Sequence, residues 1–215
     1  MPTLKIIATQ VCDALDRPFD GMFLARVKDL IMQEASMFIR RSIEKDGIDT
    51  ETVMYFDIPL TKIDKYENTS FTSGEFILRS VSKIPKPIRY KSDVPFVFVG
   101  TLDKKISFTY CNGANVEYDK LLPLVGTRIT YDYTNEYIRI YNNTKLELIR
   151  IGYPVANMRD AIMILNNVSQ EDADNLYELP IPYDIINQIK TSIIKNELSV
   201  TDDKDKLQPK HLDNI

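Results

Sequence analysis

The chain has 215 residues and a formal net charge of −4, from 27 Lys and Arg against 31 Asp and Glu. A chain of this length buries roughly 70% of its unfolded-state surface, so it needs neither disulfides nor metals to hold a core. The mild negative charge argues against a general binder of nucleic acid or anionic membranes, although it leaves room for a local basic patch.

The residue types that are scarce exclude most kinds of enzyme site. His211 is the only histidine and stands in a polar segment at the C-terminal end, so a catalytic triad would have to recruit it from there. Cys12 and Cys111 show no paired spacing, which argues against a zinc site. The seven glycines form neither a dinucleotide fingerprint nor a phosphate-binding loop. We therefore expect a protein without catalytic residues, cofactor or metal.

Residues 1–47 predict a helical hairpin. Apolar residues recur every three or four positions after Thr3, which is placed to cap the first helix. A second, longer helix starts after Asp20 and ends at Asp46-Gly47, where glycine supplies a left-handed stop. The face of this helix expected to be buried carries Leu24, Val27, Ile31, Ala35 and Phe38.

Residues 48–153 change to a period of two, which is typical of half-buried strands. The seven strand candidates are residues 53–58, 75–81, 96–99, 105–110, 128–133, 137–141 and 146–151. Asn112-Gly113 and residues 134–136 have the composition of hairpin connections. We expect an antiparallel β-barrel or sandwich in the middle of the chain.

Residues 154–198 predict C-terminal helices that pack with the N-terminal helices. Ser169 opens a capping-box pattern, and Pro180 and Pro182 lead into a last amphipathic helix. The apolar face of this helix carries Ile185, Ile186, Ile189, Ile193 and Leu198. Residues 199–215 are polar and predict an extended tail. The fold class that follows is α+β.

Two acidic clusters are candidates for metal sites. Neither cluster has the alternating ligands, turn glycine and closing Glu of a calcium loop. We interpret the first as helix-start acids and the second as a solvated tail. A pair such as Asp57 and Asp64 could do acid–base chemistry in principle, but with 31 acids in the chain the pair carries little information. The two clusters are Glu171, Asp172 and Asp174, and Asp202, Asp203 and Asp205.

Charge is distributed unevenly along the chain. Residues 1–46 carry 7 basic and 7 acidic side chains, residues 47–153 carry 14 and 13, and residues 154–215 carry 6 and 11. The net negative charge therefore lies in the C-terminal part. Within the β region, no acid occurs from Phe76 to Ser92. The basic side chains of this segment are Arg79, Lys83, Lys86, Arg89 and Lys91.

This basic segment, residues 79–91, is interrupted by two prolines and has three interpretations. It can be a solvated loop that protects a sheet edge, a contact with an acidic protein surface, or a contact with DNA phosphates. All three remain open from the sequence.

The N-terminal segment has none of the continuous apolar run of a signal peptide, since Lys5, Gln10 and Asp13 interrupt it. No apolar run approaches the roughly 18 residues that a membrane span requires. We expect a soluble protein that is not secreted and has no membrane partner. Cys12 lies in a helical pattern, which favours a small buried hydrophobic residue over a reactive thiol.

One family resemblance stands out between residues 129 and 198. The β region closes on residues 146–154 (LELIRIGYP), and after a short helical connection residues 179–189 read LPIPYDIINQI. This order of elements and the Pro-Ile-Pro motif before the last helix resemble head–tail connector proteins, ring or adaptor, of short-tailed bacteriophages. The similarity is greatest to those of crAss-like phages of Bacteroidetes.

The resemblance implies a structural virion protein at the head–tail junction, assembled in the cytoplasm of the bacterial host. Copies would form a ring, usually twelve-fold, that contacts the portal protein and adjacent tail or ring proteins, while DNA passes through without sequence-specific binding. Two alternatives stay open. The first is a nucleic-acid-binding module that uses residues 79–91, and the second is a carboxylate-based, metal-dependent nuclease.

A closed ring requires two different complementary patches on each subunit. We hypothesise that the basic segment 79–91 of one subunit contacts the acidic region 154–215 of the next. The candidate inter-subunit or partner contacts are Arg79, Lys83, Lys86, Arg89, Lys91, Pro180, Pro182, Ile185, Ile189 and Ile193.

Overall fold

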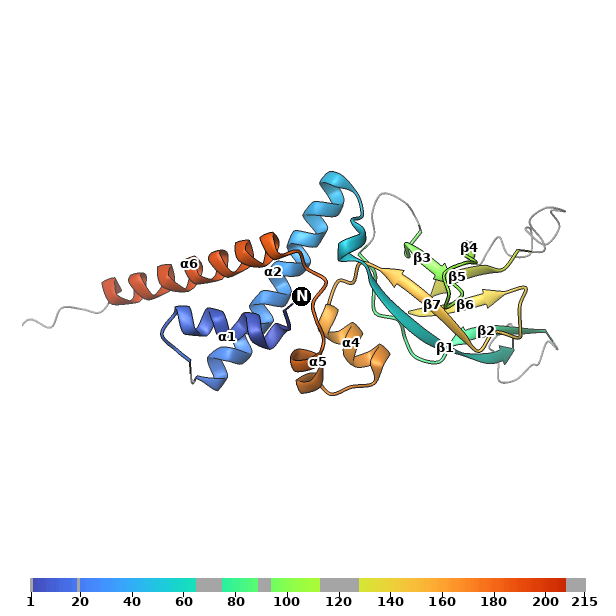
Figure 1. Ribbon diagram of the computed structural model, residues 1–215, viewed down its shortest axis with the longest axis horizontal. Helices are drawn as coiled ribbons and strands as arrows, with labels where there is room; N and C mark the ends of the chain where they lie inside the picture. Colours follow the sequence, from blue (N-terminus) through green and yellow to red (C-terminus); the bar gives the residue numbers. More distant parts are fainter. Residues whose placement is uncertain (1, 19, 65–74, 89–93, 113–127, 208–215) are drawn as a thin grey trace, which may run out of the picture.

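The computed structural model describes residues 2–18, 20–64, 75–88, 94–112 and 128–207, with side chains up to Ser199. Helices from both ends of the chain gather at one end of an elongated molecule, and the strands form a separate module at the other end (Figure 1). The α+β class and the N- and C-terminal helices around a central β module are as predicted.

The first two helices begin and end where the sequence predicts. Helix α1 spans Leu4–Ala14 and helix α2 spans Gly21–Asp46. The Thr3 hydroxyl accepts a hydrogen bond from the Ile6 N–H at 3.5 Å, and the Asp20 carboxylate accepts one from the Phe23 N–H at 2.9 Å. Gly47 ends α2 with a φ of 89°, a conformation that side-chain-bearing residues rarely adopt.

The buried face of α2 is turned slightly from the predicted one. Leu24 and Phe38 are only half-buried, whereas Ile39 and Ile43 are buried. The difference arises because α1 and α6 both pack on this helix and together select its buried face. The buried side chains are Phe23, Val27, Ile31, Met32, Ala35, Ile39 and Ile43.

All seven predicted strands are present, in a sheet of order β3-β7-β1-β2-β6-β5-β4. Their bounds are β1 Met54–Asp64, β2 Phe76–Ser80, β3 Phe98–Gly100, β4 Thr109–Tyr110, β5 Thr130–Thr134, β6 Tyr137–Tyr141 and β7 Leu148–Tyr153. A short 3-10 turn, Thr50–Thr52, precedes β1. The long strand β1 pairs with β7 along its first half and with β2 along its second half.

The two ends of this sheet meet, so the module is a nearly closed barrel. The Phe108 N–H donates to the Val99 carbonyl at 2.7 Å, and the Thr101 N–H donates to the Ile106 carbonyl at 3.0 Å. These bonds join the outer edge of β3 to the residues just before β4. The barrel interior is filled by Ile58, Leu78, Ile138, Ile140, Ile149 and Ile151.

One strand pairing differs from the predicted antiparallel arrangement. Strands β4 and β5 pair in parallel, with Thr109 opposite Thr130. The predicted hairpin connection at Asn112-Gly113 stays a prediction. Gly113 lies outside the described residues. The other predicted hairpin is confirmed, because Asn135 and Glu136 join β5 to β6 with φ values of 54° and 68°.

Three helices complete the chain: α4 spans Met158–Asn166, α5 spans Gln170–Leu176 and α6 spans Tyr183–Leu207. The Ser169 hydroxyl accepts a hydrogen bond from the Asp172 N–H at 3.1 Å, as the capping pattern predicts. Helix α6 runs beyond residue 198, so residues 199–207 are helical rather than extended. That segment contains neither Pro nor Gly, and it continues a helix whose first half is already packed.

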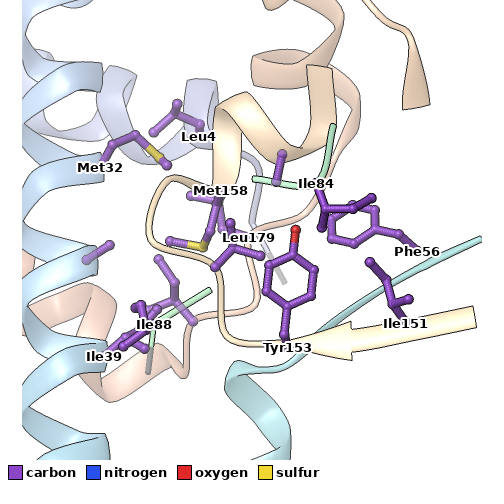
Figure 2. Close-up of a cluster of buried hydrophobic side chains, with 14 of the residues drawn as sticks. Leu4, Met32, Ile39, Phe56, Ile84, Ile88, Ile151, Tyr153, Met158 and Leu179 are labelled. Carbon is purple, nitrogen blue, oxygen red and sulfur yellow. The ribbon is translucent and has the colours of Figure 1, made fainter. Parts of the chain in front are cut away.

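A single hydrophobic cluster joins the two modules (Figure 2). Tyr153, at the end of β7, is fully buried, and its ring centroid lies 5.0 Å from that of Phe96 and 6.1 Å from that of Phe56. Met158 and Leu179 approach the same ring from the helical side. Burial raises the pKa of the Tyr153 hydroxyl, which has no hydrogen-bond partner within the described part of the chain.

Candidate interaction surfaces

The loop after β2 holds its lysines outward because its isoleucines are buried. Ile84 and Ile88 are 0% and 6% exposed, while the Lys83 and Lys86 side chains are 60% and 79% exposed. The Ile84 N–H donates to the Glu136 carbonyl at 2.7 Å, which ties the loop to the β5–β6 turn. Burial and exposure thus alternate along this segment.

A surface cavity of about 600 Å³ lies between this loop and the β5–β6 turn. We call it the lysine cavity; its lining residues are Lys83, Lys86, Pro87, Tyr133, Asn135 and Glu136. One carboxylate serves both lysines, since the two Glu136 oxygens lie 3.3 Å from Lys83 Nζ and 3.9 Å from Lys86 Nζ. The two lysines stand out in the sequence as part of a basic segment, whereas Glu136 is 53 positions from Lys83 and carries no such signal.

The other basic residues of the segment do not add to the described lining. Arg79 lies on β2, where its guanidinium carbon stacks 4.6 Å from the centre of the Tyr137 ring. Arg89 and Lys91 lie outside the described residues. Of the five basic candidates, the structure therefore brings Lys83 and Lys86 together at one cavity.

The proline-isoleucine candidates mostly serve the chain's own core. Ile189 and Ile193 are 1% and 2% exposed and belong to the cluster that α6 forms with α1 and α2. Pro180 and Pro182 are half-buried on either side of the fully buried Ile181. In the first turn of α6, Ile185 is half-buried and Tyr183 is 65% exposed.

A group of charged residues that the sequence did not reveal links α2 to α4 and α5. Asp174, predicted as a helix-start acid, is buried, and its two oxygens accept bonds from Lys28 Nζ at 2.7 Å and Arg159 Nε at 2.9 Å. The Arg159 guanidinium also donates to Asp29 at 2.7 Å. Because the partners of Asp174 are up to 146 positions away, no local pattern signals this network.

The opposite face of α5 is exposed and acidic. Ala173 and Asp174 are buried, whereas Glu171 and Asp172 are exposed and Leu176 is 70% exposed. Residues three or four positions apart lie on one side of a helix, so Asp172 and Leu176 are neighbours on this outer face. We call Glu171, Asp172 and Leu176 the α5 knob. It is a large apolar side chain beside two carboxylates.

A second apolar surface lies on the outside of the barrel. The Tyr55 ring covers Gly152 so closely that a Cβ on Gly152 would lie 2.5 Å from the ring. Lys104 Nζ lies 3.5 Å from the centre of the same ring. Tyr55 and Ile106 remain 42% and 55% exposed. The Tyr55 ring can lie over this position because Gly152 has no side chain.

Asp57 and Cys12, two residues considered for chemistry, are held in structural surroundings. Asp57 forms two hydrogen bonds with the Arg150 guanidinium, at 2.6 and 2.8 Å, and these bonds lower the pKa of the Asp57 carboxyl. Burial raises the pKa of the Cys12 thiol, which is 2% exposed, as expected of a small buried residue. Within these segments, no three His, Cys, Asp or Glu side chains come together as metal ligands would.

No helix in the described segments combines the length and the apolar character that crossing a membrane requires. The described residues include exposed surfaces of two characters, basic at the lysine cavity and acidic at the α5 knob.

Comparison with known proteins identifies the family. No curated protein matches the chain. The family described as "Phage tail ring protein 2" (CrAss_Ring_2) matches residues 22–210, which include α2 apart from its first residue, the whole barrel and all C-terminal helices. This match confirms the resemblance seen in residues 129–198 and extends it over most of the chain. The protein therefore belongs to the tail ring protein 2 family of crAss-like phages, whose members are structural components of the phage tail.

Proposed function

We propose that the protein is a subunit of a connector ring that lies between portal and tail, and that DNA passes through this ring without sequence-specific contacts. The family assignment supports self-association into a ring. The observation that carries the proposal is the presence of two chemically different surfaces on one elongated subunit, the lysine cavity and the α5 knob.

A ring closes by head-to-tail contacts, in which one surface of each copy meets a different surface of the next. A self-complementary surface would instead stop at a dimer. The α5 knob lies in the helical module, whereas the lysine cavity is lined largely by barrel residues. Two surfaces at separate places favour a closed arrangement, for which we propose the twelve-fold symmetry usual in connector rings.

Passage of DNA requires that the ring not hold phosphates firmly. The chain carries a net charge of −4, and the two lysines of the cavity already share the Glu136 carboxylate. Since phosphate contacts supply most of the non-specific affinity for DNA, a subunit of this charge favours release over retention. The protein thus acts as a passive conduit, with no catalytic step.

The test is to mix the purified protein with its portal protein and to measure mass and symmetry by native mass spectrometry and electron microscopy. We expect a closed ring seated on the portal, with a central channel wide enough for duplex DNA. A protein that stays monomeric and never joins the portal would overturn the proposal.

A second candidate function is nucleic-acid binding through the basic segment, which the two exposed lysines of the cavity favour. This alternative predicts an affinity for DNA that falls steeply with salt, with a log–log slope of about −0.9 for each phosphate contacted. It also predicts that Lys83→Gln with Lys86→Gln weakens binding at every sequence. For a connector ring we expect weak binding at physiological salt that hardly changes in this variant.

A further inference from the structure

We propose that the α5 knob of one copy docks into the lysine cavity of the next copy around the ring. The inference rests on the proposed ring and assigns its two contact surfaces. The sequence suggests a contact between the basic segment 79–91 and the acidic region 154–215, and the proposal reduces this contact to two small sets of residues. These are Lys83, Lys86, Pro87 and Tyr133 on one copy, and Glu171, Asp172 and Leu176 on its neighbour.

The cavity is held ready for a partner by its own backbone. The Tyr133 hydroxyl donates a hydrogen bond to the Ile84 carbonyl at 2.9 Å. Ile84, which lies between Lys83 and Lys86 in the sequence, is fully buried. Pro85 and Pro87 fix the φ angle on either side of Lys86. Because the loop is anchored before binding, a docking partner does not bear the cost of ordering it.

The charge in the cavity is incompletely balanced. Two ammonium groups share one carboxylate at 3.3 and 3.9 Å, and both lysine side chains are more than half exposed. Exposed pairs of this kind contribute little stability on their own. A second carboxylate brought in by a neighbour would therefore gain a favourable partner without displacing a strong bond.

The knob is fixed in orientation by the buried charges on its other side. Asp174, on the inner face of α5, is held by Lys28 and Arg159, so the helix cannot rotate without breaking both ion pairs. Asp172 also accepts a hydrogen bond from the Ser169 hydroxyl at 2.8 Å. Leu176 is thereby kept 70% exposed at the end of the helix.

The two surfaces match in charge and in apolar character. Glu171 and Asp172 are opposite in charge to Lys83 and Lys86, and Leu176 is an apolar side chain of the kind that a floor of Pro87 and Tyr133 can cover. Such a contact has an apolar centre and a charged rim, as specific interfaces do. Electrostatic complementarity of this kind sets partner and register.

The experiment reverses one surface at a time. The cavity variant is Lys83→Glu with Lys86→Glu, and the knob variant is Glu171→Lys with Asp172→Lys. All four residues are exposed, so each variant should keep the circular dichroism spectrum of the unchanged protein. Under the conditions in which the unchanged protein forms rings, alone or on the portal, we expect each variant to assemble about a hundredfold more weakly, because like charges then face each other.

Mixing the two variants provides the decisive measurement. The reversed knob now fits the reversed cavity, and the unchanged knob of one variant fits the unchanged cavity of the other. We expect rings to reform with the two variants alternating, in equal numbers and with an even total, which native mass spectrometry resolves if one variant carries a mass label. The control matched to the cavity variant, Lys45→Glu with Lys145→Glu, makes the same change in net charge at exposed positions outside both surfaces and should leave assembly unchanged.

The outcomes separate this inference from the ring itself. If the unchanged protein forms rings and both variants do as well, the pairing is wrong while the ring stands. Variants that fail alone and also fail when mixed contradict the pairing too, because the restored complementarity then has no effect. If the unchanged protein forms no ring even with its portal, the proposed function fails first.

Discussion

Arg159 shows how one residue can connect elements that are far apart in the chain. Its guanidinium donates to Asp174 on α5 and to Asp29 on α2, and its side chain is only 12% exposed. A buried carboxylate that loses its partner retains the full cost of leaving water. Arg159 therefore keeps α4, α5 and α2 in a fixed arrangement.

The variant Arg159→Met tests this role. We expect a loss of about 2–3 kcal/mol in the free energy of unfolding, measured by urea denaturation at neutral pH, because Asp174 then keeps only Lys28 as a partner. The control is Arg26→Met, which removes a 2.7 Å ion pair to Glu197, but from an arginine whose side chain is 60% exposed. There the expected loss is below about 1 kcal/mol. Equal losses in the two variants would contradict the importance of burial.

Helix caps could be predicted from the sequence, whereas ion pairs between residues far apart in the chain could not. Thr3, Asp20 and Ser169 cap helices because their oxygens reach N–H groups three residues away. Asp174 resembled these helix-start acids, yet its partner Lys28 comes from another helix. A helix cap is determined by residues within four positions of each other, whereas a buried ion pair depends on tertiary packing.

At the scale of elements, two glycines of the barrel have different functions. A Cβ on Gly100 would collide with the backbone carbonyl oxygen of Ile106, in the segment that closes the barrel. A Cβ on Gly152 would meet only the ring of Tyr55, a surface side chain that can move aside. The first glycine permits closure of the sheet, and the second permits an aromatic ring to lie flat on it.

Alanine substitutions distinguish the two. We expect Gly100→Ala to lower the free energy of unfolding by about 2 kcal/mol, since the backbone of β3 must move away from residue 106. Gly152→Ala should cost less than about 1 kcal/mol, because the Tyr55 ring can rotate into solvent. Thermal and urea unfolding measure both. A larger loss for Gly152→Ala would show that closure does not depend on the close approach at Gly100.

The existence of the strands was predictable, but not all of their partners. Alternation of apolar and polar residues marks a strand whatever lies beside it, so all seven were found. Pairing is set by contacts between distant segments. The parallel alignment of β4 with β5, and the position of β7 between β3 and β1, left no signal in either strand alone. The end of α6 was missed because polar composition favours disorder, while the packed first half extends the helix.

At the scale of the whole molecule, the hydrophobic cluster around Tyr153 makes the two modules one unit. Residues from α1, α2 and α6 and residues from inside the barrel belong to the same cluster. We expect a single unfolding transition, with equal midpoints by far-UV circular dichroism for the helices and by near-UV tyrosine signals for the barrel. Two separated midpoints would show that the modules fold independently.

The contact surfaces were only partly foreseeable at this scale. The prolines and lysines of residues 79–91 pointed to an exposed basic loop, and Lys83 and Lys86 do project from it. The Glu136 carboxylate reaches that loop from a hairpin turn far along the chain. The outward face of α5 depends on which acid in this region is buried. Nothing in the sequence distinguishes the buried acid from its neighbours, which are Glu171, Asp172, Asp174 and Glu178.

The hydrogen bonds between β3 and the residues before β4 affect how copies of this protein can associate in a ring. An open sheet presents unpaired backbone groups along its outer strands, and identical chains held side by side can join through them into aggregates without limit. Here the backbone groups of Val99 and Phe108 are already bonded to each other. An edge bonded in this way is less open to strand addition, which favours recognition through side chains and an assembly that stops growing at a fixed number of subunits.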